Sequence, residues 1–127
     1  MKQRARRGDP PLPSAAVLIR GDLLDPDVLE ASARRNFKVY GFYGISVFAE
    51  SADVPWTELA ATRLAAAEWL VLFTVRELTA SGLGLWDTGM APHFDLVHDE
   101  LTELVARMLA TSHRVIQNPH HVRGGDH

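Results

Sequence analysis

The sequence predicts an α+β protein in which a mixed β-sheet is flanked by helices. Short apolar runs that favour strands alternate irregularly with segments of helical periodicity. The most apolar run, Trp69–Thr74, has no polar face and therefore fits an interior strand. A chain of 127 residues fits one domain. A domain of this size buries roughly two-thirds of its unfolded surface, which is enough for a hydrophobic core.

The composition excludes several classes of protein. The chain has no cysteine, so disulfide scaffolds and thiolate metal sites are excluded, and no metal site is predicted. A net charge of −3 argues against a dedicated nucleic-acid-binding protein. There is no apolar run of about 20 residues to span a membrane, and no apolar segment of a signal peptide follows the basic start. We therefore expect a cytoplasmic protein.

The chain divides into a globular domain and two tails. Residues 1–13 combine four basic side chains with three prolines and predict a flexible tail. Residues 14–119 predict a single globular domain, and residues 120–127 predict a loose C-terminal tail. The basic tail is either a solvated leader or an arm that contacts RNA or a protein partner. Nucleic-acid contact is expected only through this tail.

The first half of the domain predicts strand, helix, strand and helix. Residues 15–20 form an apolar run that Gly21 ends. Asp25 followed by Pro26 is a typical helix start, and this helix is expected to reach about residue 35, with Val28, Leu29 and Ser32 facing inward. Residues 39–48 predict a bent strand or a tight hairpin. Residues 55–67 predict a helix with Leu59 and Leu64 on one side.

The second half begins with the interior strand and ends with a short one. Thr74 and Glu77 have the spacing of a capping box, so a short helix is expected to follow the strand and to stop at Gly82. Residues 94–97 predict a strand. Apolar residues of the segment 100–110 recur at i, i+3, i+4, i+7 and i+8, which predicts an amphipathic helix. Residues 113–116 predict a last strand.

Four residues of the first half are candidates for a site. Arg20 ends a strand beside a glycine, where a guanidinium could bind a phosphate or carboxylate through two parallel bonds, or be an ordinary surface arginine. Glu58 lies in the first turn of a helix and could act as a base or hold a ribose hydroxyl, although the helix dipole also favours glutamate there. Tyr43 offers a ring for stacking, and Ser46 lies on the same bent strand.

Histidines form the next group of candidates. On a strand, His93 and Asp95 share a face, so the carboxylate could orient the imidazole, whereas His98 points away. This spacing suits acid–base catalysis such as RNA cleavage better than a three-ligand metal site. Further histidines are His113, His120 and His121. Structural or surface roles remain open for all of them.

Residues 15–80 resemble the RES domain, a member of the ADP-ribosyltransferase-like group. Four features carry the resemblance: a strand bearing Arg20, then Arg35-Asn36-Phe37, then the strand Gly44–Ala49 followed by Ser51 and a helical Glu58, and finally the apolar strand Trp69–Thr74. The resemblance implies an ADP-ribosyltransferase-like fold. It also implies a small bacterial enzyme that consumes NAD or transfers its ADP-ribose part.

The resemblance also implies roles for individual residues. Arg20 and Arg35 would bind the pyrophosphate of NAD, Tyr43 and Ser46 would belong to the cofactor site, and Glu58 would act with Arg20 in catalysis. Many such proteins are toxins that a partner restrains, so an antitoxin or another protein partner is expected. Two alternatives remain: a small ribonuclease that uses histidine acid–base catalysis, and a non-catalytic partner-binding protein using the helix 100–110 or a sheet edge.

Overall fold

The structure, a computed structural model, describes residues 12–121. The tails expected at the two ends therefore lie, for residues 1–11 and 122–127, outside the described part of the chain. The helices are α1 (Pro26–Tyr40), α2 (Trp56–Thr62), α3 (Val75–Ala80) and α4 (Leu101–Ala110). The strands are β1 (Val17–Gly21), β2 (Gly44–Ala49), β3 (Trp69–Thr74), β4 (Gly84–Met90), β5 (His93–Val97) and β6 (Arg114–Gln117).

The strands form one six-stranded sheet in the order β4-β5-β2-β1-β3-β6. The α+β class and the interior position of β3 are confirmed, but the expected mixed sheet is wrong, because every strand pair is antiparallel. A parallel pair needs a crossover that returns the chain to the starting end of the first strand. Here α1 ends beside the end of β1, since Tyr40 and Arg20 line one pocket. The strand β2 therefore starts where β1 finishes and runs in the opposite direction.

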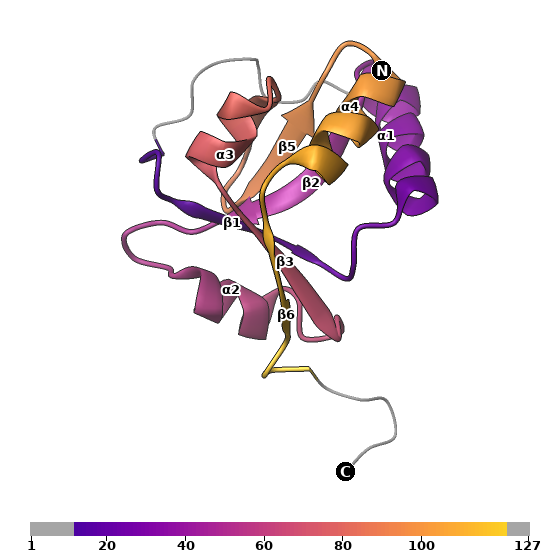
Figure 1. Cartoon of the computed structure of the whole chain (residues 1–127). Helices are drawn as coiled ribbons and strands as arrows, with labels where there is room; N and C mark the ends of the chain where they lie inside the picture. The colour runs from indigo at the N-terminus through magenta and orange to yellow at the C-terminus, as the bar shows by residue number, and fades with distance from the viewer. Residues whose placement is uncertain (1–11, 122–127) are drawn as a thin grey trace.

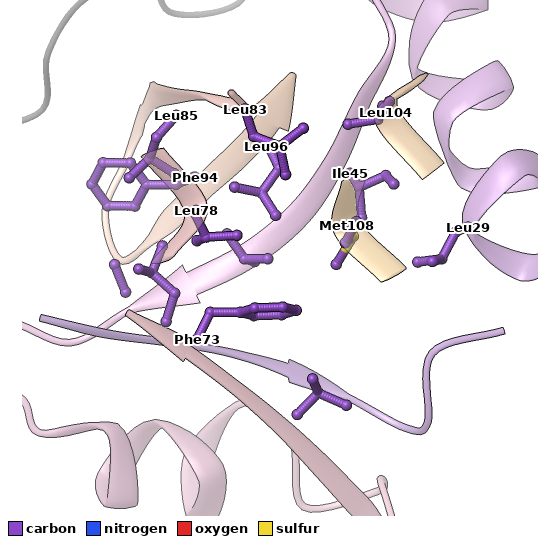
Figure 2. Packing of buried hydrophobic residues seen from close by; sticks show 14 of the residues in the cluster. Leu29, Ile45, Phe73, Leu78, Leu83, Leu85, Phe94, Leu96, Leu104 and Met108 are labelled. Carbon is purple, nitrogen blue, oxygen red and sulfur yellow. The ribbon is translucent and has the colours of Figure 1, made fainter. Parts of the chain in front are cut away.

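Helices cover both faces of the sheet (Figure 1). On one face, α1, α3 and α4 enclose the larger core, in which Leu29, Leu78 and Leu104 meet strand residues such as Phe73 (Figure 2). On the other face, α2 packs Leu59 against apolar residues of β1 and β3. Successive side chains of a strand point to opposite faces, so β1, β2 and β3 contribute to both cores.

Helix α1 begins as its sequence predicts and ends later. The Asp25 carboxylate accepts hydrogen bonds from the backbone N–H groups of residues 27 and 28, and Pro26 occupies the first turn. The helix then continues to Tyr40 and stops at Gly41, whose φ of 87° is left-handed. The prediction of a strand from residue 39 is therefore wrong for its first part. The inward position of Val28 is also wrong: this side chain is 53% exposed, because Leu29 and Ala33 form the buried stripe.

The later elements follow their local signals closely. Thr74 and Glu77 form the expected capping box at the start of α3, and Gly82 has a φ of 78° just after it. Strand β5 and helix α4 match the predicted segments. Strand β6 begins one residue late, and α2 is shorter than expected because it stops at Thr62. Strand β4 was not predicted.

A buried asparagine after β6 joins the end of the described chain to the loop between α2 and β3 through hydrogen bonds. Asn118 is 3% exposed, and its Nδ2 donates to the carbonyl oxygens of Leu64 (2.9 Å) and Ala67 (3.0 Å). Replacing Asn118 by alanine removes the donor from both carbonyls, so we expect a loss of about 1–3 kcal/mol in unfolding free energy. Urea denaturation followed by circular dichroism measures it. Gln117→Ala, on the exposed neighbour, should change stability by less than about 0.5 kcal/mol. Equal small losses for both variants would contradict this role.

Candidate functional site

Arg20 lies at the end of β1 on the side of the sheet that faces α1. Leu18, two residues earlier, is part of the larger core, and alternation along the strand places Arg20 on the same face. Its Nη1 donates a hydrogen bond to the carbonyl oxygen of Ser46 at 2.8 Å. Gly21 is closely packed, since a Cβ on this glycine would lie 2.9 Å from the Cβ of Ala67. The guanidinium therefore reaches toward α1 and not toward the glycine.

Arg20 lines a pocket of about 530 Å³ between α1 and the ends of β1 and β2. This volume lies within the range of small-molecule sites, about 300–1,000 Å³. Arg35 and Ser46 also line it, so three of the predicted site residues come together. The pocket, which we call the arginine pocket, is lined by Arg20, Ser32, Arg35, Asn36, Val39, Tyr40, Gly44 and Ser46.

Two guanidinium groups, those of Arg20 and Arg35, line the arginine pocket. Burial lowers the pKa of the Arg20 guanidinium, and the positive charge of Arg35 lowers it further, while Asp22 opposes both effects. Neither guanidinium forms an ion pair with a carboxylate in residues 12–121. Arg20 bonds a backbone oxygen, and Arg35 Nη2 donates to the Ser32 hydroxyl at 3.4 Å. An anion in the pocket would relieve the repulsion between the two cations and supply the carboxylate-like partner that both lack.

A second, aromatic pocket adjoins the turn between α1 and β2. Tyr43 stacks on Phe37 with ring centroids 4.5 Å apart, and Phe42 packs against Trp86 at 4.3 Å. All four rings line a cavity of about 230 Å³. Tyr43 is thus near the arginine pocket without lining it. The two cavities are neighbours, because Asn36, which lines the first, donates to the carbonyl oxygen of Phe42 at 3.0 Å.

Gly44 lets this turn pack against α1. A Cβ at Gly44 would lie 2.8 Å from Asn36 Nδ2 and 3.0 Å from the Phe42 ring. Any side chain at residue 44 would therefore displace the amide that holds the turn. The glycine keeps both pockets in their present shape.

Glu58 is not brought into the arginine pocket. It projects from α2, which covers the opposite face of the sheet (Figure 1). There it lines a different cavity of about 480 Å³, together with Glu50, Arg63 and Asp87. The carboxylate that the resemblance assigns to catalysis therefore lies apart from the two arginines.

A different carboxylate, Asp95, lies next to Ser46. Its side chain is fully buried in β5. The Ser46 Oγ is 3.4 Å from Asp95 Oδ1, and His93 Nε2 is 3.8 Å from the same oxygen. The prediction that His93 and Asp95 share a strand face is confirmed. The pairing of Ser46 with Asp95 across β2 and β5 was missed, because only the strand register reveals it.

No family model, curated protein or solved structure matches this chain. Inferences about function therefore depend on the chemistry of the pockets.

His98 and His113 make local hydrogen bonds with the backbone. His98 Nδ1 accepts from the backbone N–H of Glu100 at the start of α4, and His113 Nδ1 lies 2.6 Å from the Thr111 carbonyl oxygen. Within residues 12–121, no three His, Asp or Glu side chains are grouped as metal ligands. In the same part of the chain, no helix is both long and apolar enough to cross a bilayer.

Proposed function

We propose that this chain is an ADP-ribosyltransferase-like enzyme that binds NAD and cleaves or transfers its ADP-ribose part. The observation that carries the proposal is the pair of guanidiniums, Arg20 and Arg35, which line one pocket without a carboxylate partner in the described residues. A diphosphate offers the planar-fork donors of two arginines several oxygens at once. Ser32 and Asn36, which also line the pocket, add polar groups for a sugar.

The neighbouring aromatic pocket supports a ligand that carries a flat ring. Tyr43 and Trp86 present large apolar surfaces there, and aromatic rings stack favourably on planar heterocycles. A dinucleotide combines such rings with a diphosphate, which is the combination that the two neighbouring cavities favour. The resemblance to the RES domain points to the same ligand.

The proposal includes restraint by a protein partner. A small enzyme that consumes NAD would deplete the cell that makes it, and the resemblance implies a toxin-like enzyme held by an antitoxin. The apolar face of α4, which the sequence offers as a partner-binding surface, is not accessible to a partner. Its apolar residues Leu104 and Met108 are fully buried in the core.

Replacing Arg20 by lysine tests the binding site. Lysine keeps the charge but cannot make the paired bonds of a guanidinium. Losing one charge-assisted hydrogen bond costs about 1.5–3 kcal/mol, so NAD affinity should fall about tenfold or more. Isothermal titration of the full chain with NAD measures the affinity, and the wild-type chain should also release nicotinamide from NAD.

Arg34→Lys is the matched control. Arg34 is exposed on the same helix as Arg35 and pairs with Glu30. Its replacement should leave NAD affinity unchanged. Failure of the wild-type chain to bind NAD, or equal affinity in the Arg20 and Arg34 variants, would overturn the proposal.

One observation favours a second candidate, a ribonuclease. His93 and Asp95 are close enough to act as an acid–base pair, and two arginines near Ser46 could bind a phosphodiester. Incubation with single-stranded RNA tests this candidate: cleavage by the wild-type chain that His93→Gln abolishes would support it. NAD cleavage without RNA cleavage would exclude it.

A further inference from the structure

The cavity of about 480 Å³ that Glu58 lines lies apart from the two pockets of the proposed NAD site. It shares no lining residue with the arginine pocket or with the aromatic pocket. Seven of its thirteen lining residues are apolar, including Leu59, Pro92 and Phe94. Its volume and its apolar lining are both typical of small-molecule sites, in which a few polar groups orient the ligand.

This cavity is situated at one end of the sheet. Ala49 is the last residue of β2, and its backbone N–H donates to the carbonyl oxygen of Pro92, just before β5, at 2.9 Å. Phe94 belongs to the larger core and Leu59 of α2 to the core on the other face, yet both residues line the cavity. The cavity therefore extends around the end of the sheet, where no strand separates the two faces.

Helix α2 lines the cavity along one side of its surface. The four lining residues are linked by spacings of three and four, which makes them neighbours on a helix; they are Glu58, Leu59, Thr62 and the C-terminal cap Arg63. Leu59 is buried, whereas Glu58 and Arg63 are exposed. The cavity thus combines an apolar interior with charged side chains at its rim.

Carboxylates outnumber cations among the lining residues that the structure describes. Glu50, Glu58 and Asp87 are acidic, and Arg63 is basic. The two carboxylate oxygens of Glu50 accept from backbone N–H groups of β1 and α2, so this side chain is already used in the fold. Within residues 12–121, neither Glu58 nor Asp87 forms an ion pair with a basic side chain. A cleft lined mainly by one sign of charge attracts ligands of the opposite sign.

We propose that this cavity, the acid-rimmed pocket, binds a small organic amine with an apolar body. The ammonium group pairs with the carboxylates of the rim, and the apolar body contacts the interior formed by residues such as Leu59 and Phe94. A diphosphate has the same sign of charge as the rim, so the pocket is not an extension of the NAD site. The inference does not depend on the proposed function, and it gives Glu58 a role other than the catalytic one that the resemblance implies.

Titration of the full wild-type chain with phenylbutylamine tests this site. Two ligands are controls: phenylbutyrate, which has a similar body and a negative head group, and butylamine, which lacks the ring. Phenylbutyrate should bind about tenfold or more weakly, because attraction to the rim becomes repulsion. Butylamine should also bind about tenfold or more weakly, because it buries no ring. Equal affinity for the amine and the carboxylate, or no binding of phenylbutylamine at millimolar concentration, would overturn the proposal.

Three substitutions test the rim with opposite expected signs. Glu58→Gln and Asp87→Asn each remove a negative charge at nearly constant size, so each should weaken phenylbutylamine binding about two- to fivefold. Arg63→Gln removes a repelling positive charge and should strengthen binding by a similar factor. Glu68→Gln is the matched control, on an exposed residue between α2 and β3, and should bind like wild type. Unchanged affinity in both Glu58→Gln and Asp87→Asn would contradict the ligand class.

Backbone amide NMR spectra of the wild-type chain locate the bound amine. Shifts concentrated in residues 49–63 and 87–94 support the acid-rimmed pocket, whereas shifts centred on Arg20 and Arg35 overturn it. None of these measurements uses NAD. Failure of amine binding therefore leaves the proposed NAD function intact, and failure of NAD binding leaves this inference intact.

Discussion

Leu104→Ala is expected to lower the unfolding free energy by about 2–5 kcal/mol, the usual cost of truncating a buried leucine. Leu104 has no exposed surface and lies where α4 meets the larger core. Removing three side-chain carbons there leaves a cavity between α4 and the sheet, because neighbours such as Met108 cannot fully collapse into it. Urea denaturation followed by circular dichroism measures the change.

Leu23→Ala is the matched control for this truncation. Leu23 is 55% exposed in the loop before α1, so the same chemical change there should cost less than about 0.5 kcal/mol. Comparable losses at the two positions would mean that α4 does not dock through Leu104.

Elements with a complete local signal could be predicted from the sequence. The capping box of Thr74 and Glu77 and the apolar periodicity of α4 need no information from the rest of the chain. The end of α1 differs from the prediction because Gly41 fits two local patterns, a bend in a strand and the left-handed end of a helix, and the structure has the second. Strand β4 was missed because Asp87, Thr88 and Gly89 favour a turn.

The relative direction of the strands could not be predicted, because no local sequence pattern contains this information. Alternating strands and helices suit parallel and antiparallel sheets alike until the position of the helix is known. Helix α1 returns to the same end of the sheet, which sets β1 and β2 antiparallel.

In the candidate site too, some features follow from local sequence and others only from the fold. Anion binding by Arg20 was predicted from its type and position and anion binding by Arg35 from the resemblance to the RES domain, and both stay predictions. The meeting of these arginines with Ser46 follows from α1 lying across the ends of β1 and β2. The separation of Glu58 follows from α2 covering the other face. The contact of Ser46 with Asp95 joins residues 49 positions apart, and only the pairing of β2 with β5 creates it.

Phe73→Ala is expected to have the largest effect on stability of the substitutions considered. Phe73 is 1% exposed, lies in the interior strand β3, and reaches into the larger core, where Figure 2 shows it beneath the residues of α3 and α4. Its ring also packs near His113, with centroids 5.5 Å apart. Truncating a buried phenylalanine costs about 3–5 kcal/mol, against about 5–15 kcal/mol of total stability in a typical domain, so roughly a fifth or more of the stability would be lost.

The measurement is again urea denaturation, with thermal unfolding as a second readout. Phe37→Ala provides the control, because Phe37 is 45% exposed on α1 and contacts mainly Tyr43. Stacked aromatic pairs contribute about 0.5–1.5 kcal/mol beyond their buried area, and Phe37 buries much less of its surface than Phe73, so this control should lose clearly less stability than Phe73→Ala. If Phe73→Ala lost as little as Phe37→Ala, β3 would not be an interior strand of a well-packed core. Because β3 joins β1 to β6, such a result would also call into question the geometry that places Arg20 at its pocket.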